Sequence, residues 1–375
     1  MTKHVRVAPG ALIVGKPLPW TVFDAEGSIL LRQGYVIQNE MQLERLFKQG
    51  LFQPREMEAE EADPETIEDT RARNPFVDYP ALLKALETTL TTITKREPLA
   101  RKRLNGLARL IDRICQEAPD PCLALVHLYS VQPTANEQTL FYAIICHFVA
   151  VQLGLDEKRR LVLIGAALTA NLALLPFLDQ LNNSPKGLSA RQREVIRRHP
   201  LLSIKALQEA GIDNPRLLGI IEQHHERHDG SGYPAGLTDK DILFEARILA
   251  LAEAYTAMIT RRGYRERFNV GQAMESIRDA YREQPRPVIY KGLLNILTPY
   301  PPGSLVRLFN NEIAVITHRS GAYGSHMAQA VIAANGRLYG QAEKRDCSLL
   351  DFNIRAVEDV TILPSMDFSQ LWGFE

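Results

Sequence analysis

The amino-acid sequence predicts a mainly helical protein, with a helical bundle between two small segments that contain β-strands. From residue 80 to 131, leucine and isoleucine recur every three or four positions, which is the spacing of the apolar face of a helix. Further helices that end at glycine or proline follow to about residue 290, with no alternating strand pattern. Before residue 55 and after residue 299, short apolar runs alternate with glycine or asparagine turns, as in strands.

Five segments are expected along the chain. They are an N-terminal module with strands and one helix (1–55), an acidic linker (56–79), a helical connector (80–130), the main helical domain (131–298) and a β-rich C-terminal extension (299–375). The linker has almost no large apolar side chain, so it cannot bury a core. The last residues, 371–374, are expected to form a frayed tail.

Composition narrows the classes of function. Lys+Arg and Asp+Glu number 44 each, so the net charge is zero and no global basic surface predicts nucleic-acid binding. No apolar run is long enough to span a bilayer, and the first ten residues lack the apolar core of a signal peptide. The four cysteines (Cys115, Cys122, Cys146, Cys347) show no paired spacing, which is typical of free thiols in a reduced compartment. We expect a cytoplasmic protein without a membrane span.

One stretch, residues 224–234, concentrates side chains that bind metal ions or phosphate. It reads His-His-Glu-Arg-His-Asp-Gly-Ser-Gly-Tyr-Pro, and its glycines and proline suit a sharply bent loop. Imidazoles and carboxylates are the ligands of iron, manganese or zinc. Adjacent helical residues point about 100° apart. His224 and His225 are therefore expected to reach one ion only at a helix end or against neighbouring helices.

Two further ligand-type residues precede and follow this stretch. His199 ends one expected helix directly before Pro200, and Glu253 lies in a later apolar helix. Taken alone, His199 is better interpreted as a structural histidine, since histidines often simply make hydrogen bonds. The pair His224 and His225, close to Glu226 and Asp229, is a much less ordinary arrangement.

The stretch from His224 to Pro234 resembles the signature of HD-GYP domains, which are bacterial metal-dependent phosphohydrolases that cleave the second messenger cyclic di-GMP. Residues 199–200, 248–255 and 262–265 are also similar to segments of that family. The resemblance covers about residues 135–300 and implies a helical bundle of the HD superfamily. It also implies metal ligands, phosphate-binding residues and a signature loop. The implied metal ligands are His199, His224, His225 and Glu253. The implied substrate-binding residues are Arg262 and Arg265. The implied loop residues are Glu226, Asp229, Gly230, Gly232, Tyr233 and Pro234. Tyr233 is expected to be exposed and to serve a partner.

The sequence departs from the family where the family's His-Asp pair belongs. By register, Thr169 and Ala170 replace both of these ligands, and the family's nearby lysine is also missing. Gln138 stands where the family has an upstream histidine, and Glu253 replaces an aspartate. His147 falls on a different face of its helix and is expected in the core. A partial site remains, which would hold one divalent ion (iron, manganese or zinc) or none.

Three hypotheses follow from this ligand set. In the first, the protein is a catalytically impaired HD-GYP protein that binds cyclic di-GMP or a diguanylate cyclase-type signalling partner. In the second, it is an active phosphodiesterase with an altered site that forms pGpG or GMP. In the third, it is a scaffold whose histidines only make hydrogen bonds. The ligand losses favour the first, because neutral side chains cannot bridge two metal ions. Whether the protein is a homodimer stays open.

Overall fold

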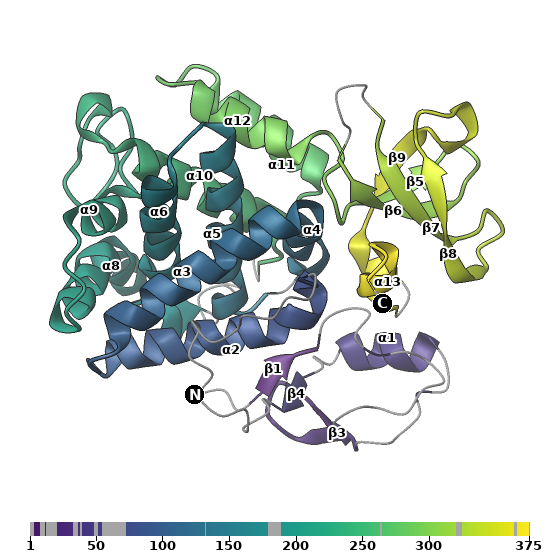
Figure 1. Cartoon of the computed structure of the whole chain (residues 1–375), viewed down its shortest axis with the longest axis horizontal. Helices are drawn as coiled ribbons and strands as arrows, with labels where there is room; N and C mark the ends of the chain where they lie inside the picture. The colour runs from purple at the N-terminus through teal and green to yellow at the C-terminus, as the bar shows by residue number, and fades with distance from the viewer. Residues whose placement is uncertain are drawn as a thin grey trace. The chain divides into compact units, whose positions relative to one another are not determined.

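The computed structural model describes residues 4–7, 12, 21–32, 37, 40–48, 52–54, 73–131, 133–178, 189–262, 265–319, 325–363 and 366–374. Within these ranges, the expected fold class is confirmed: a helical bundle is accompanied by a small N-terminal sheet and a C-terminal sheet (Figure 1). The acidic linker lies outside the described residues up to residue 72, as does much of the N-terminal module.

The bundle carries most of the secondary structure. Its elements are α2 (Pro75–Thr94), α3 (Ala100–Glu117), α4 (Pro119–Tyr129), α5 (Ala135–Gln152), α6 (Glu157–Thr169), α8 (Ala190–Glu209), α9 (Pro215–Gln223), the 3-10 turn η1 (Asp239–Asp241), α10 (Phe244–Ile259), α11 (Val270–Tyr281) and α12 (Val288–Leu297). The helix expected from residue 80 begins at Pro75, because Asn74 caps it by accepting a hydrogen bond from Phe76 N. None of the helices that the structure describes combines the length and apolar character that a bilayer crossing needs.

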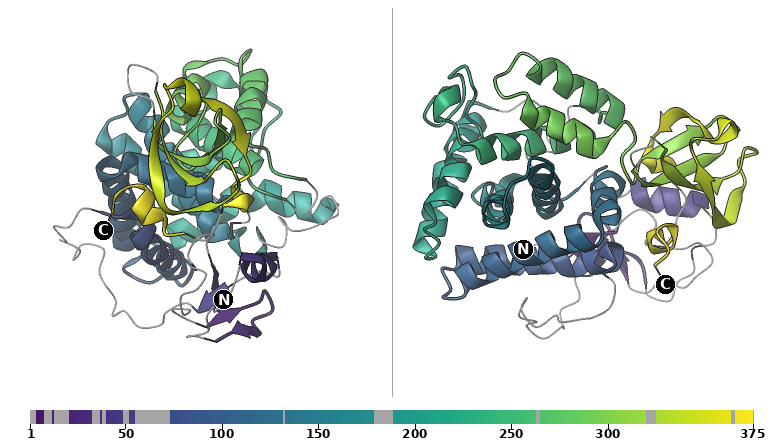
Figure 2. Two further views of the ribbon diagram at one scale, coloured as in Figure 1. Left: turned by 90° about the vertical axis from the view of Figure 1, so that its right-hand side faces the viewer. Right: turned by 45° about the horizontal axis from the view of Figure 1, so that its top comes forward.

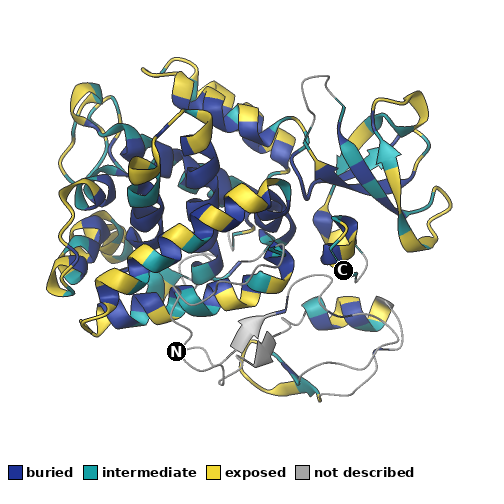
Figure 3. Cartoon of the chain, in the orientation of Figure 1, coloured by how far each residue is buried: buried dark blue, intermediate teal, exposed yellow. Residues whose placement is uncertain are grey.

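The packing follows from the distribution of apolar residues. Helix α5 is buried along almost its whole length and packs against α6, α10 and α12, as expected of a helix that is apolar on all sides. Helices α2 and α3 lie side by side, each with one buried and one exposed face (Figures 2 and 3). The central position of α5 requires that the polar side chains on it find partners inside the bundle.

His147 of α5 has such partners, and its expected place in the core is confirmed. Its Nδ1 lies 2.8 Å from Asp112 Oδ1, and Arg160 donates to the same carboxylate from Nε at 2.5 Å and from Nη2 at 3.0 Å. The two bases hold the pKa of Asp112 at about 2, against the opposing effect of burial. This network joins α3, α5 and α6.

Two small sheets lie outside the bundle. The N-terminal sheet has the strand order β1-β4-β2-β3 and is formed by β1 (His4–Arg6), β2 (Val22–Phe23), β3 (Ile29–Leu31) and β4 (Phe52–Pro54), with helix α1 (Glu40–Lys48). The C-terminal sheet has the order β8-β7-β6-β5-β9 and is formed by β5 (Leu305–Leu308), β6 (Ile313–His318), β7 (Met327–Ile332), β8 (Leu338–Asp346) and β9 (Ile354–Glu358). The expected frayed tail is wrong, because a short helix α13 (Phe368–Leu371) buries Phe368 and Leu371.

Candidate metal centre

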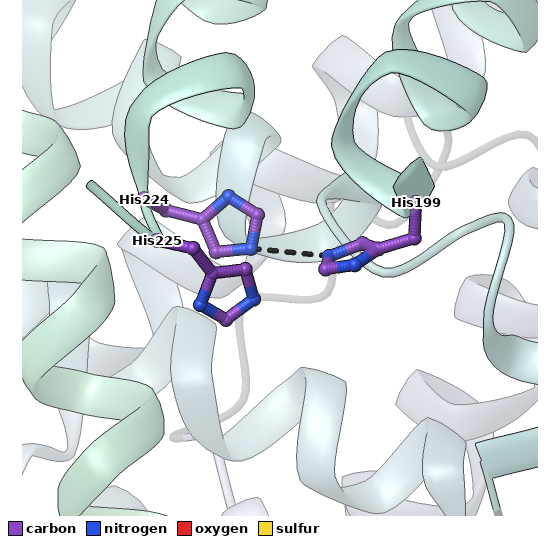
Figure 4. Close-up of side chains that lie close together, drawn as sticks. All are labelled: His199, His224 and His225. Atoms are coloured by element: carbon purple, nitrogen blue, oxygen red, sulfur yellow. Dashed lines mark hydrogen bonds between the residues drawn. The ribbon is translucent and has the colours of Figure 1, made fainter. Parts of the chain in front are cut away.

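Three histidines converge in the bundle (Figure 4). His199 lies inside α8, and the expected end of its helix before Pro200 is wrong, because α8 accommodates Pro200 and continues to Glu209. His224 is the C-terminal cap of α9, with His225 directly after it. One ligand nitrogen from each ring lies within 4.8 Å of the other two. Helix α9 ends at Gln223, so the two adjacent histidines leave a helix end, which is one of the two arrangements that lets both reach one point.

Hydrogen bonds fix the tautomers of the two buried rings. His199 Nδ1 donates to Ile196 O at 2.6 Å, and His224 Nδ1 donates to Ile221 O at 2.6 Å. Because a carbonyl oxygen only accepts, both Nδ1 atoms carry a proton. Burial lowers the pKa of His199 to about 3 and that of His224 to about 4, so both rings are neutral near pH 7. Their Nε2 atoms are therefore unprotonated.

These two Nε2 atoms lie 3.3 Å apart. Two nitrogen lone pairs at that distance repel each other unless a cation lies between them. Burial and the neighbouring His224 and His199 also hold the pKa of His225 well below its ordinary value, so the third ring is neutral as well. The donor set thus fits a single metal ion of the kind that imidazole prefers, such as zinc or iron.

Glu253 of α10 adds a carboxylate at the edge of this cluster. Its Oε2 lies 3.8 Å from His224 Nε2 and 4.0 Å from His225 Nε2. Its Oε1 accepts a hydrogen bond from Asn171 Nδ2 at 2.5 Å, and burial raises its pKa to about 7. Asn171 therefore directs the other carboxylate oxygen toward the histidines.

The segment around Thr169 and Ala170, where the metal ligands were expected to be lost, contacts the cluster through the hydrogen bond from Asn171 to Glu253. Thr169 donates its hydroxyl to Gly165 O at 2.7 Å, one turn back in α6, and Ala170 is fully buried. The sequence predicted the loss of the ligands at Thr169 and Ala170 but did not assign the neighbouring Asn171 a part in the site. Helix α6 ends at Thr169, and helical periodicity does not tell which side chain of the following turn faces inward.

Arg262 and Arg265, the expected phosphate-binding residues, have different surroundings. Arg262 Nη2 donates to Gln138 Oε1 at 3.4 Å, and its Nη1 is buried with no hydrogen-bond partner among the described residues. Tyr142 donates to the same Gln138 oxygen at 3.3 Å, and both Glu253 and Arg262 influence its pKa. Arg265 instead donates to Ala257 O at 2.7 Å and stacks over Phe268. Arg262 thus has a buried donor without a partner among the described residues, whereas the guanidinium group of Arg265 is held by Ala257 O and Phe268.

The loop after His225 is held by Glu226. Its carboxylate accepts hydrogen bonds from the backbone N–H groups of residues 235, 236 and 237 at 2.7, 3.0 and 2.9 Å. Glycine is required at position 232, because a Cβ there would lie 2.4 Å from Glu226 Cα. Gly230 has a φ of 76°. Asp229 accepts from Ser231 N and Oγ, so its carboxylate stabilises the turn.

Tyr233 was expected to be exposed and to serve a partner, but the structure places its side chain partly inside the protein. It is half-buried, and its ring stacks on His225 with centroids 4.7 Å apart and an interplanar angle of 29°. The next residue, Pro234, follows it in the loop that Glu226 holds. The loop therefore supports the histidine cluster from one side by fixing the ring of His225.

Comparison with known proteins shows what this domain is similar to. Residues 122–284 match the HD domain family. The solved structure of Bd1817, an HDG"Y"P protein from Bdellovibrio bacteriovorus, has the same fold with a TM-score of 0.54 at 18% identity, covering 78% of this chain and 99% of that one.

The curated relatives narrow the class further. The chain is 30% identical over 166 residues to the cyclic di-GMP phosphodiesterase PdeB of Borreliella burgdorferi, covering 44% of this chain and 43% of that protein. It is 26% identical over 219 residues to the cyclic di-GMP phosphodiesterase PA4108 of Pseudomonas aeruginosa, covering 56% and 52%. The matches thus span about half the length of these relatives. They support the resemblance to the HD-GYP cyclic di-GMP phosphodiesterase family, while the loss of its His-Asp pair stays a prediction.

Proposed function

We propose that the HD domain acts on cyclic di-GMP at a metal centre built on His199, His224 and His225, with Glu253 as a fourth ligand. The observation that carries this proposal is the pair of unprotonated Nε2 atoms of His199 and His224, 3.3 Å apart in a buried site. A divalent ion bound there would polarise a phosphodiester and lower the pKa of a bound water. Iron, manganese and zinc are the candidates.

The residues of the chain supply the surrounding functions. The buried Nη1 of Arg262 provides a donor for a phosphate oxygen, since guanidinium groups pair well with phosphate. Tyr233 holds the ring of His225 by stacking, and Asn171 holds Glu253 by a hydrogen bond. These contacts fix two of the four ligand side chains before any ion binds, which favours binding.

Hydrolysis of cyclic di-GMP to pGpG or GMP is the first candidate activity. It is supported by the curated relatives, several of which are named as cyclic di-GMP phosphodiesterases. The chain holds the three imidazoles and a carboxylate in one place, a set sufficient for an ion with an open position.

Binding without efficient hydrolysis is the second candidate, and one observation favours it. The segment from Thr169 to Asn171 brings only a neutral amide to Glu253, so no second carboxylate is available to bridge two ions. Under this reading, the domain would recognise cyclic di-GMP or a diguanylate cyclase-type partner through the loop that Glu226 holds. Loss of a charge-stabilising group costs about 10²–10³-fold in turnover.

One purified sample separates the candidates. Bound metal is measured by mass spectrometry, and the protein is then incubated with cyclic di-GMP and manganese(II) or iron(II), with His199→Ala as the inactive control. Formation of pGpG or GMP that is absent from the control supports hydrolysis. Nucleotide binding in calorimetry without product supports the second candidate. If neither metal nor nucleotide binds, both candidates are wrong and the scaffold hypothesis stands.

A further inference from the structure

A cavity of about 330 Å³ lies in the HD domain beside the loop that follows α9. Residues of this loop, of α10, of the end of α11 and the turn after it, and of α12 form its walls. Three arginines line it: Arg227, Arg247 and Arg286. None of the three clustered histidines, nor Glu253, lines it, so it is distinct from the candidate metal centre.

Two of the three acidic side chains around the cavity hydrogen-bond to the loop itself rather than to these arginines. The carboxylate of Glu226 accepts three backbone N–H groups, and that of Asp229 accepts from Ser231. Asp239 is shared, with Arg247 Nη2 at 2.5 Å and Arg286 Nε at 3.8 Å from its Oδ1. Of the three carboxylates, Asp239 is thus the one paired with the arginines of the cavity, and it serves two guanidinium groups.

Arg227 and Arg247 also have donors that the protein does not use. Arg227 makes no side-chain hydrogen bond or ion pair with any residue that the structure describes. Arg247 Nε is buried without a hydrogen-bond partner among the same residues. The unpartnered Nε of Arg247 carries a desolvation penalty, which a bound anion would remove, whereas Arg227 is exposed and its donors face solvent.

The backbone at Arg286 is a separate indication. This residue has a φ of 63°, although it is not glycine and lies between Pro285 and Pro287. Strained backbone of this kind persists where the surrounding structure holds it, and it occurs preferentially at ligand-binding sites. In this case the strained residue contributes one of the three guanidinium groups of the cavity.

The rest of the wall is suited to the carbon part of a ligand. Ala250, Ile289 and Tyr290 give it apolar surface, and Ile289 and Tyr290 are buried. Burial raises the pKa of Tyr281, which also lines the cavity, so its phenol keeps its proton and can donate a hydrogen bond. A few polar groups on an apolar wall, in a volume of this size, are typical of a small-molecule site.

We propose that this cavity binds a small phosphate-bearing molecule, with Arg227, Arg247 and Arg286 contacting the phosphate and the apolar wall contacting the organic part. Guanidinium groups match phosphate oxygens in geometry and charge. The site does not depend on the proposed metal centre. Arg227 lies two residues after His225 and belongs to the loop that supports the histidines, so a ligand that contacts Arg227 contacts this loop.

The test is calorimetric titration of the full chain with GMP and, separately, with inorganic phosphate, after metal removal by EDTA. We expect saturable binding of both, with GMP binding more tightly because the apolar wall adds contacts. Arg286→Ala is expected to weaken GMP binding at least about tenfold, as the loss of a charged hydrogen bond does. Arg286→Gly, which also relieves the backbone strain, is expected to weaken it equally, and Arg227→Ala is a second variant of the phosphate contacts.

Arg282→Ala is the matched control. Arg282 is an exposed arginine that caps the C-terminal end of α11. It is paired with Glu283 and lies outside the cavity wall. Binding that is unchanged in this variant and weakened in the Arg286 variants supports the site. The proposal is overturned if metal-free protein shows no saturable binding of GMP, or if Arg282→Ala weakens binding as much as Arg286→Ala. Thermal unfolding of each variant by circular dichroism checks that the fold is retained.

Discussion

The Nε2 atoms of His199 and His224 face each other across 3.3 Å, and neither carries a proton. Each ring donates its Nδ1 proton to a carbonyl in the preceding turn of its own helix, so the tautomer of each ring is set by local backbone. The repulsion between the two lone pairs is therefore built into the fold. A metal ion removes it by accepting both pairs, which links metal binding to the stability of the domain.

Removing one of these imidazoles should abolish most of the metal affinity. His199→Ala is expected to lower the affinity for zinc or manganese by more than about tenfold, since even the loss of a supporting contact costs that much. Competition with a fluorescent chelator measures it. His318→Ala, at the exposed end of β6, is the control and should leave the affinity unchanged. An equal loss in the control would contradict the assignment of the site.

Replacing Asn171 by aspartate should make the domain more dependent on metal. The new carboxylate would stand where the Asn171 amide now lies 2.5 Å from Glu253 Oε1, so two like charges would repel in the metal-free protein and be offset by an ion. We expect Asn171→Asp to lower the melting temperature in EDTA and to show a larger rise with manganese than the unmodified protein. Differential scanning fluorimetry measures both.

Asn171→Ala is the companion variant for this comparison. It removes the hydrogen bond to Glu253 without adding charge. A rise with manganese that is as large in Asn171→Ala as in Asn171→Asp would show that the added carboxylate takes no part in metal binding. If Asn171→Asp also increases the formation of pGpG, the missing carboxylate limits hydrolysis in the natural sequence.

Much of the bundle could be predicted because its signals are local. Ser189 and Gln192 form the capping box that begins α8, although this helix continues through Pro200 to Glu209 and does not end at Pro200 as the sequence predicted. The apolar spacing likewise predicted which segments are helical. The chain end could not be predicted this way, because the helix Phe368–Leu371 has four residues and is too short to show a helical repeat of apolar side chains.

The residues of the candidate site could be predicted from the sequence, but the contacts between their side chains could not. The sequence motif brought His224, His225 and Glu226 to attention, and the structure places the two histidines beside His199. Asn171 was not assigned a part, since it lies in a turn where no periodicity applies. The stacking of Tyr233 on His225 was also unexpected, because glycine and proline neighbours indicate a bent loop but not the side on which its aromatic ring packs.

Gly232 should be intolerant of any side chain. A Cβ at this position would lie 2.4 Å from both Glu226 Cα and Arg227 N, which are backbone atoms that cannot move aside without shifting the loop. We expect Gly232→Ala to destabilise the domain by about 1–3 kcal/mol and to weaken metal binding through His225. Gly340→Ala in β8, where nothing lies within 4 Å of the added carbon, is the control. Urea unfolding and metal titration measure the two effects, and equal stability of both variants would contradict the close approach.

The buried network of Asp112, His147 and Arg160 should make the bundle sensitive to acid. The pKa of Asp112 lies at about 2 in the folded protein, below its ordinary value of 3.8, so the folded state favours the charged carboxylate. Its stabilising contribution is complete above pH about 4 and is lost as the pH falls toward the folded pKa. Asp112→Asn should therefore unfold more easily at pH 7 and show a weaker dependence of stability on pH in that window.

The size of this effect follows from the burial of the partners. Removing one member of a buried charge pair costs about 3–5 kcal/mol, because the remaining charge loses its compensation. Arg160 is 12% exposed in this network, whereas Arg101 and Asp213 form a pair that is 68% and 77% exposed. Asp213→Asn is thus the matched control and should change the free energy of unfolding by less than about 1 kcal/mol. Urea unfolding between pH 3 and pH 7 distinguishes the two variants, and similar losses in both would show that the Asp112 network carries no special stability.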